Sequence, residues 1–149
     1  MIEGLARDAV LAALEAFPAR LAAAAAAGAA ASRGVPNGEW GPNEIVWHLI
    51  AVETDVHQAR LADLDRLPAP VWDWAEPGPW PGEPDLALDA LLDRFAGLRA
   101  ATVATVAALD AAGWARSGTH TTLGVFDVRA LLANAVDHDE QHLGGLAQT

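Results

Sequence analysis

The sequence lacks cysteine, lysine and tyrosine, and each absence removes a class of chemistry. Without cysteine, the chain has no disulfide, no thiolate nucleophile and no Cys-ligated zinc or iron–sulfur centre. Without lysine, it has no Schiff base, no P-loop phosphate clamp and no Ser–Lys dyad. Neither serine, Ser32 nor Ser117, lies in a G-x-S-x-G motif. Catalysis therefore depends on His, Asp, Glu, Arg, Thr and whatever a bound metal contributes.

Basic residues are also scarce. Nine arginines stand against twenty acidic residues, so the formal net charge at pH 7 is −11. A surface this acidic repels phosphate backbones, and no arginine cluster reverses the sign, so we expect no nucleic-acid partner. The first four residues lack the basic region of a secretory signal, and the apolar run between Arg20 and Arg33 is too short to span a bilayer. We therefore expect a cytoplasmic protein that does not enter a membrane.

The residues that are present favour helices. Hydrophobic residues make up 52% of the 149 positions, and many of them are alanine, the strongest helix former. Apolar residues recur at helical spacing in four segments, which we expect over residues 2–31, 42–67, 85–113 and 127–147. Pro18 lies inside the first segment and predicts a kink or a restart near Phe17. The length suits one domain, so the sequence predicts a single all-α four-helix bundle over residues 1–149.

Residues 68–84 form a long segment without helical periodicity. It holds six prolines and three tryptophans, which are Trp72, Trp74 and Trp80. A structureless connection of this length inside a compact domain usually has a function. About 17 residues at ~3.3 Å each reach ~55 Å, whereas the preceding helix is ~37 Å long. The segment is therefore long enough to cross from one end of a bundle to the other.

Three of the five histidines stand out by their placement. His138 and His142 are four residues apart on the last helix, so both rings can reach one ion. His48 lies early in the second helix, on a stripe that is otherwise apolar because Ile45 and Val52 share it. Each of the three can instead be a core or rim histidine with one hydrogen bond, and spacing alone leaves both interpretations open.

The other two histidines are predicted to lie on the surface. His57 is nine residues from His48, which turns it to the opposite face of an α-helix, and His120 falls in a predicted loop.

Two known metal motifs are excluded by the spacing around these histidines. The run His138–His142 differs from H-E-x-x-H because Asp139 occupies the second position and Glu140 projects about 100° further round the helix. A ferritin-type di-iron site needs Glu-x-x-His pairs, whereas the Glu/His pairs of the second helix are spaced by four. The site is therefore neither a zincin nor a di-iron carboxylate centre.

Two segments resemble a known family. The stretch WGPNEIVWHL at positions 40–49, followed by Glu53, resembles the second helix of the DinB/YfiT-like superfamily, in which a Trp-Ser-Pro-like cap precedes His-Leu. The stretch from Asn134 to Leu143, with its H-x-x-x-H-L pattern, resembles the last helix of that family. Gly41 stands where the family usually has a Ser or Thr cap. The resemblance spans essentially the whole chain.

This resemblance implies a four-helix bundle in up-down-down-up order with a three-histidine site made of His48, His138 and His142. It implies a divalent metal, zinc or nickel, and a homodimer. Characterised relatives include S-transferases that use bacillithiol or mycothiol and a mycothiol-dependent maleylpyruvate isomerase. The implied function is a metal-dependent transfer of a low-molecular-weight thiol to a small-molecule substrate. The alternatives are a metal-dependent hydrolase and a non-catalytic metal-binding stress protein.

The direction of the helices follows from the ligand positions without the family. His48 lies near the start of its helix, whereas His138 and His142 lie in the last third of theirs. Parallel helices would separate these side chains by about 12–15 Å along the axis, but antiparallel helices bring them together. The second and fourth helices are therefore predicted to be antiparallel, which requires the 68–84 crossover between the second and third helices.

The remaining site candidates are assigned by position. Three neutral imidazoles leave coordination positions open for water and substrate, which is typical of catalytic sites. Trp40, Trp47 and Trp80 either form the wall of an apolar substrate pocket or simply cover the end of the bundle. Glu44 and Asn134 lie one turn from His48 and His138, and each is a candidate base or a residue that orients a ligand.

Overall fold

The computed structural model describes residues 6–31, 40–78 and 86–147. The elements follow in the order α1 (Arg7–Ala31), α2 (Pro42–Val52), the π-helix η1 (Glu53–Gln58), α3 (Ala59–Arg66), β1 (Val71–Trp72), α4 (Leu88–Ala107), α5 (Ala111–Ala115), β2 (Ser117–His120), β3 (Gly124–Asp127) and α6 (Val128–Ala147). Because α2, η1 and α3 are contiguous, they form the single second helix of the prediction.

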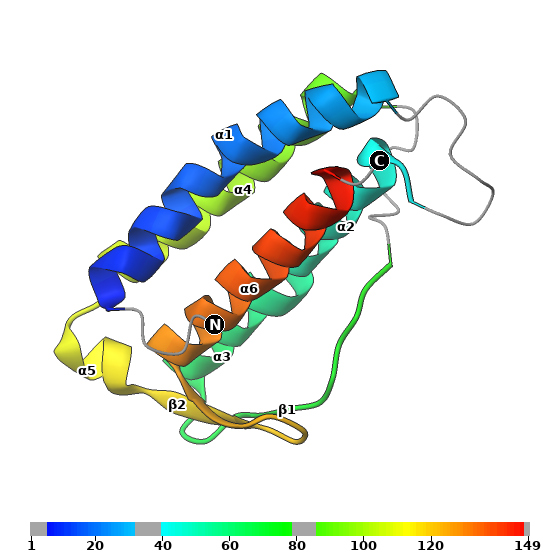
Figure 1. Cartoon of the computed structure of the whole chain (residues 1–149). Coiled ribbons are helices and arrows are strands. Elements are labelled where there is room, and N and C mark those ends of the chain that lie inside the picture. The colour runs from blue at the N-terminus through cyan, green and yellow to red at the C-terminus, as the bar shows by residue number, and fades with distance from the viewer. Residues whose placement is uncertain (1–5, 32–39, 79–85, 148–149) are drawn as a thin grey trace.

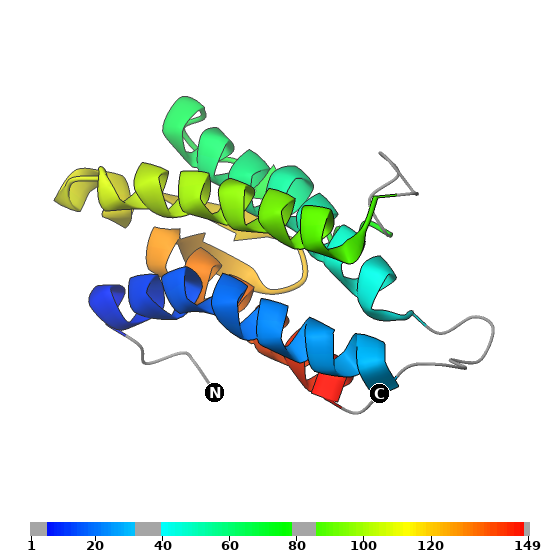
Figure 2. The ribbon, with the colours of Figure 1, turned by 90° about the horizontal axis from the view of Figure 1, so that it is seen from above.

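The long helices form a bundle in which α1 and α6 run in one direction and α2–α3 and α4 run in the other (Figure 1). The helix α1 packs against both α6 and α4, and α4 packs against α2 (Figures 1 and 2). The predicted up-down-down-up order is confirmed, and α2 is antiparallel to α6. The connection from α3 to α4 therefore leaves one end of the bundle and reaches α4 at the other.

Pro18 does not interrupt the first helix, so the predicted alternative of a restart near Phe17 is wrong. The helix α1 continues from Arg7 to Ala31, and residues 1–5 lie outside the described part of the chain. Proline has no N–H, so the carbonyl of Leu14, four residues earlier, loses its helical donor. The Arg99 side chain replaces that donor, with Nη1 3.3 Å from the Leu14 carbonyl oxygen. A tertiary contact thus compensates for the local defect.

The ends of the other helices agree with the prediction in part. Pro42 begins α2 after Gly41, and the Asp127 carboxylate accepts a hydrogen bond from the Ala130 N–H at 2.8 Å, which caps α6 as predicted. The third helix is shorter than expected, because α4 ends at Ala107 and a separate helix α5 begins after Asp110. Residue 85, where the third helix was expected to begin, lies outside the described residues.

A small three-stranded sheet, absent from the prediction, joins the crossover to the segment before α6. The strand β1 pairs in parallel with β2, and β2 pairs antiparallel with β3 in a hairpin that contains Gly124 at φ +92°. The register places Trp72 opposite His120. The sheet thereby fixes the start of the crossover beside the bundle, where it contributes to the site.

The apolar face of α1 is buried within the bundle. By length and composition alone, residues 7–27 of this helix would be able to cross a bilayer. The side chains at helical spacing along its inner face are at most 1% exposed and pack against the other helices: Val10, Leu14, Phe17, Leu21 and Ala25. This inner face serves the core of the bundle, and 28% of the apolar window is buried.

Candidate metal centre

His48 of α2 is completely buried, and a backbone carbonyl determines its protonation. Its Nδ1 lies 2.7 Å from the carbonyl oxygen of Pro77, in the crossover. A carbonyl oxygen only accepts hydrogen bonds, so Nδ1 carries the proton and Nε2 is left with a lone pair. The ring of Trp40 packs against the imidazole, with 4.9 Å between ring centroids. His48 is thus oriented and held in the form that binds a metal through Nε2.

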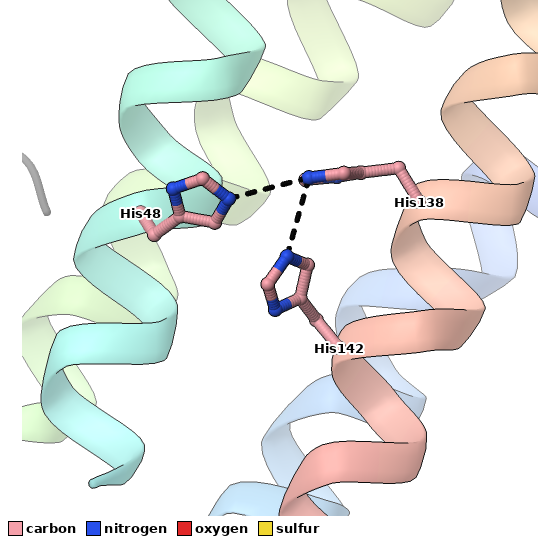
Figure 3. Close-up of side chains that lie close together, drawn as sticks. All are labelled: His48, His138 and His142. Carbon is pink, nitrogen blue, oxygen red and sulfur yellow. Dashed lines mark hydrogen bonds between the residues drawn. The ribbon is translucent and has the colours of Figure 1, made fainter. Parts of the chain in front are cut away.

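The Nε2 atoms of three histidines converge between α2 and α6 (Figure 3). The Nε2 of His138 lies 3.2 Å from the Nε2 of His48 and 3.2 Å from the Nε2 of His142. One ligand atom from each residue lies within 4.8 Å of the other two. The antiparallel packing of the two helices places the i,i+4 pair of α6 opposite the single histidine of α2.

Hydrogen bonds among the three neutral rings satisfy this arrangement poorly, whereas a cation would accept a lone pair from each ring. A neutral His138 Nε2 has either a proton or a lone pair, so it cannot both donate to the lone pair of His48 and accept from His142. Two ligands at about 2.0–2.1 Å from a tetrahedral ion are separated by about the distance observed in both 3.2 Å contacts. Imidazole nitrogens suit zinc and nickel alike.

The surroundings keep the α6 ligands neutral. Burial, together with the neighbouring imidazoles, lowers the pKa of His138 to about 3. Burial and the nearby His48 lower the pKa of His142 to about 4. Metal binding requires neutral imidazoles, so both residues are in the binding form at neutral pH.

The comparisons with known proteins agree with this architecture. A family model described as the DinB superfamily matches residues 4–146. The chain belongs to the DinB superfamily. Its fold is similar to that of a solved structure, YfiT from Bacillus subtilis, with a TM-score of 0.75 and 17% sequence identity over 98% of this chain and 88% of that chain. YfiT is described as a probable metal-dependent hydrolase with an unusual four-helix bundle topology. A search of curated proteins found no match.

A small cavity adjoins the three-histidine cluster in this DinB-superfamily protein. Its volume is about 60 Å³, and His138 forms part of its wall. The other residues that line it come from α2, η1, α3, the crossover, β2, the β2–β3 turn and α6: Val52, Val56, His57, Arg60, Trp74, Ala75, Glu76, His120, Leu123 and Asn134. The candidate Asn134 therefore faces the same cavity as His138.

The predicted wall of three tryptophans does not line this cavity in the described part of the chain. Trp40 contacts His48 and is 37% exposed, so it lies at the edge of the cluster. Trp47 packs against the hydrophobic core that α1, α2 and α4 share. Trp80 lies outside the described residues. Trp74 of the crossover lines the cavity instead.

The acid nearest to the cluster was not among the candidates. The Oε1 of Glu76 lies 3.7 Å from the Nε2 of His48, and the side chain is 54% exposed. Glu44, a candidate base or ligand-orienting residue, has its Oε2 close to Gly41, where an added Cβ would lie only 3.1 Å away. Its carboxylate therefore lies at the start of α2, where the helix dipole favours a negative charge. The sequence signal nearest to Glu76 was the length and composition of residues 68–84, which predicted a function for the segment but did not identify this residue.

The prediction that His57 and His120 lie on the surface is wrong. They are 4% and 2% exposed. His57 lies in η1, where the wider π-helical turn rotates the chain less per residue than an α-helix, so its ring faces His138 at 6.2 Å between centroids. Burial lowers its pKa to about 4. His120 lies at the end of β2, on the buried face of the alternating strand.

A buried arginine beside the cluster was also not predicted from the sequence. Arg99 of α4 is 2% exposed and donates from Nε and Nη2 to Glu53 at 3.0 and 3.0 Å. It donates from Nη1 and Nη2 to Asp139 at 2.8 and 3.0 Å, and from Nη1 to the Leu14 carbonyl. All five of its N–H groups thus have acceptors. Because Asp139 is adjacent to His138, this network also fixes the rotation of α6 at the site.

The electrostatics of this network favour the ionised form of its central arginine. Burial raises the pKa of Glu53, but the charge and hydrogen bonds of Arg99 outweigh burial and hold that pKa below its usual value. Burial lowers the pKa of Arg99, but the two carboxylates outweigh it and raise that pKa above its usual value.

Proposed function

We propose that this protein is a metal-dependent enzyme that transfers a low-molecular-weight thiol to an electrophilic small molecule. The metal, zinc or nickel, would be held by His48, His138 and His142. The observation that carries the proposal is the convergence of three Nε2 atoms, one of them with its tautomer set by the Pro77 carbonyl. Three ligands leave positions for other groups, as in catalytic rather than structural sites.

The chemistry divides between the ion and the chain. A divalent ion in this site supplies a Lewis acid that lowers the pKa of a thiol or a water. The chain has no cysteine, so the sulfur nucleophile belongs to a cosubstrate. Glu76, 3.7 Å from the His48 Nε2, is placed to accept the thiol proton. The sulfur then bonds to the electrophilic carbon of the substrate, and the leaving group departs with its bonding electrons.

Hydrolysis is the second candidate. It is favoured by the description of YfiT as a probable metal-dependent hydrolase. The same proton acceptor serves water as well as a thiol, so the two reactions differ in the nucleophile and not in the residues. A non-catalytic metal-binding protein is the third candidate, and it would bind the ion without turning over either kind of substrate.

The ligand set is tested by elemental analysis of the purified protein beside His48→Ala and His138→Ala. We expect about one equivalent of metal in the wild type and little in either variant. His57→Asn is the matched control, because it replaces a buried histidine outside the cluster and should retain the metal. At a free metal concentration 100 times Kd, binding adds about 2.7 kcal/mol to the stability of the wild type, and thermal unfolding measures this gain. Full metal content in both alanine variants would show that His48 and His138 are not the metal ligands.

The reaction is tested with the metal-loaded protein. Bacillithiol or mycothiol, incubated with a chlorinated aromatic electrophile, should give the thioether and release chloride at a rate that saturates with thiol. Glu76→Gln should lower kcat and leave the metal content unchanged. Turnover of an ester or amide in the absence of any thiol would favour hydrolysis. Metal binding with neither activity would favour the non-catalytic alternative.

A further inference from the structure

The cavity beside His138 contains a positive charge that lacks a protein counter-ion. Arg60 is 8% exposed and lines the cavity. Within the described residues, no carboxylate lies within ion-pairing distance of its guanidinium; it donates from Nη2 to the Asp73 carbonyl oxygen at 3.1 Å and lies over the ring of Trp72 at 5.6 Å. The other buried arginine, Arg99, has two carboxylate partners. Arg60 thus presents to the cavity a positive charge that no described carboxylate pairs with, and this position is suited to an incoming anion.

A second donor lines the same cavity. The Nδ1 of His120 accepts hydrogen bonds from the backbone N–H groups of Thr122 at 3.0 Å and Leu123 at 3.1 Å. A nitrogen that accepts has no proton, so the proton of the neutral ring is on Nε2, which is a donor. The ring of Trp74 packs edge-to-face on this imidazole, with 6.1 Å between centroids, and holds its orientation. No described residue accepts a hydrogen bond from this Nε2–H, so it is available to an acceptor in the cavity.

Among the described residues, the acids near the cavity form no ion pair with Arg60 and no hydrogen bond with His120. The Oδ1 of Asp73 accepts a hydrogen bond from the Thr121 hydroxyl at 3.0 Å, and only the backbone carbonyl of Asp73 contacts Arg60. Glu76 is directed to the Nε2 of His48, on the side of the metal ligands. The cavity volume of about 60 Å³ is well above that of one water, so it has room for a carboxylate.

We propose that Arg60 and His120 bind the carboxylate of the molecule that reacts at the three-histidine site, so that the substrate class is small organic acids. The proposal rests on the proposed function, because it places this anion site beside the metal. Arg60 would supply the charge and a planar pair of donors, His120 one further donor, and His138 the adjoining metal ligand. The site would thus select acids over their uncharged analogues.

The test uses a pair of thiols that differ in charge and hardly in shape, mercaptoacetate and 2-mercaptoacetamide. Their Kd values for the zinc-loaded protein are measured by calorimetry. Charge-assisted hydrogen bonds should make mercaptoacetate bind the wild type about 10-fold more tightly or better. The preference should fall to about twofold or less in Arg60→Gln and decrease in His120→Asn, which retains an acceptor for the two backbone N–H groups. Arg116→Gln, at a solvent-exposed ion pair with Asp65, is the matched control and should retain the preference.

The outcomes separate this proposal from the proposed function. Equal binding of the two thiols by the wild type overturns the anion site and leaves thiol use intact. An undiminished preference in both Arg60→Gln and His120→Asn, with metal content unchanged, also overturns it. If neither thiol binds, acetate against acetamide decides the anion site, and the reaction with bacillithiol or mycothiol decides thiol use separately. In that case, the anion site is overturned if Arg60→Gln binds acetate as tightly as the wild type does. Thermal unfolding of each variant shows whether it is folded, and Arg60→Lys, which keeps the charge, should keep part of the preference.

Discussion

At the scale of single residues, the site depends on which nitrogen of each imidazole carries the proton. The Pro77 carbonyl fixes the proton of His48 on Nδ1, and the backbone N–H groups of Thr122 and Leu123 fix that of His120 on Nε2. The first arrangement presents a lone pair to the metal position, and the second presents a donor to the adjoining cavity. Two histidines of one chain thus have opposite roles because different backbone groups contact them.

The pH dependence of stability is expected to depend in part on His57. Burial lowers its pKa to about 4 in the folded protein, against 6.5 for an unperturbed histidine, so the unfolded chain takes up this proton first as the pH falls. The contribution of neutral His57 to the free energy of unfolding is fully present above about pH 6.5 and is lost as the pH falls towards 4. The full pKa shift corresponds to about 3 kcal/mol. In the metal-free protein, His57→Asn should reduce the loss of unfolding free energy between pH 7 and 4.5 by about 1–3 kcal/mol.

Urea unfolding at a series of pH values measures this difference directly. His138 and His142 have lowered pKa values as well and remain in the variant, so only the difference between the two profiles reports on His57. Parallel profiles for the wild type and His57→Asn would contradict the prediction.

At the scale of elements, the π-helix η1 has the largest effect on the site. It interrupts the α-helical turn between α2 and α3 and brings both Glu53 and His57 into buried positions. Glu53 pairs with Arg99, and His57 lines the cavity beside His138. π-helical turns within α-helices are frequent at functional sites, and here one places two ionisable side chains at the site.

The small sheet depends on a close approach at Gly118 of β2. A Cβ added there would lie 2.5 and 2.7 Å from ring atoms of Trp72. That ring has little freedom to move, because its Nε1 donates to Asp63 at 3.0 Å. Gly118→Ala should therefore destabilise the protein by about 1–3 kcal/mol, as overpacking of a core does. Chemical denaturation of the variant measures this cost.

Gly97 of α4 is the matched control for this substitution. Apart from its chain neighbours and the backbone of its own helix, no heavy atom lies within 4 Å of a Cβ added there, and the residue is inside a helix. Gly97→Ala should stabilise the protein by about 0.5–1 kcal/mol, because alanine loses less backbone entropy than glycine on forming a helix. Effects of the same sign at the two glycines would show that the contact between Gly118 and Trp72 is not what limits the sheet.

At the scale of the whole molecule, one guanidinium joins all four long segments of the bundle. Arg99 of α4 contacts Glu53 of η1, Asp139 of α6 and the Leu14 carbonyl of α1. Arg99→Met would leave two buried carboxylates without a partner, and we expect a loss of about 3–5 kcal/mol. Denaturant unfolding measures the loss. Neutralising both carboxylates in the same chain, with Glu53→Gln and Asp139→Asn, should recover part of it.

An exposed ion pair provides the control for Arg99. Arg20 and Glu140 pair between α1 and α6 with about half of each side chain exposed, so Arg20→Met should cost only about 0–1 kcal/mol. A loss at Arg99 no larger than that at Arg20 would mean that the buried network does not hold the bundle together.

Local pattern was sufficient for the helices, and together with the family resemblance it predicted their order and the ligand cluster. Apolar periodicity reports on the face of each helix, and the i,i+4 spacing places His138 and His142 side by side whatever surrounds them. Because His48 has to reach these two rings, α2 and α6 were predicted to be antiparallel. The structure shows this arrangement and the crossover between α3 and α4 that it requires.

The remaining features were decided only by the tertiary structure, because they depend on groups that are distant in sequence. The continuity of α1 through Pro18 depends on Arg99, and the burial of His120 depends on strand pairing with the crossover. His57 faces the cavity because of a π-helical turn that apolar spacing does not reveal. Sequence patterns determine which side chains share a face of one element, whereas burial, tautomer and ion pairing depend on which other elements pack against that face.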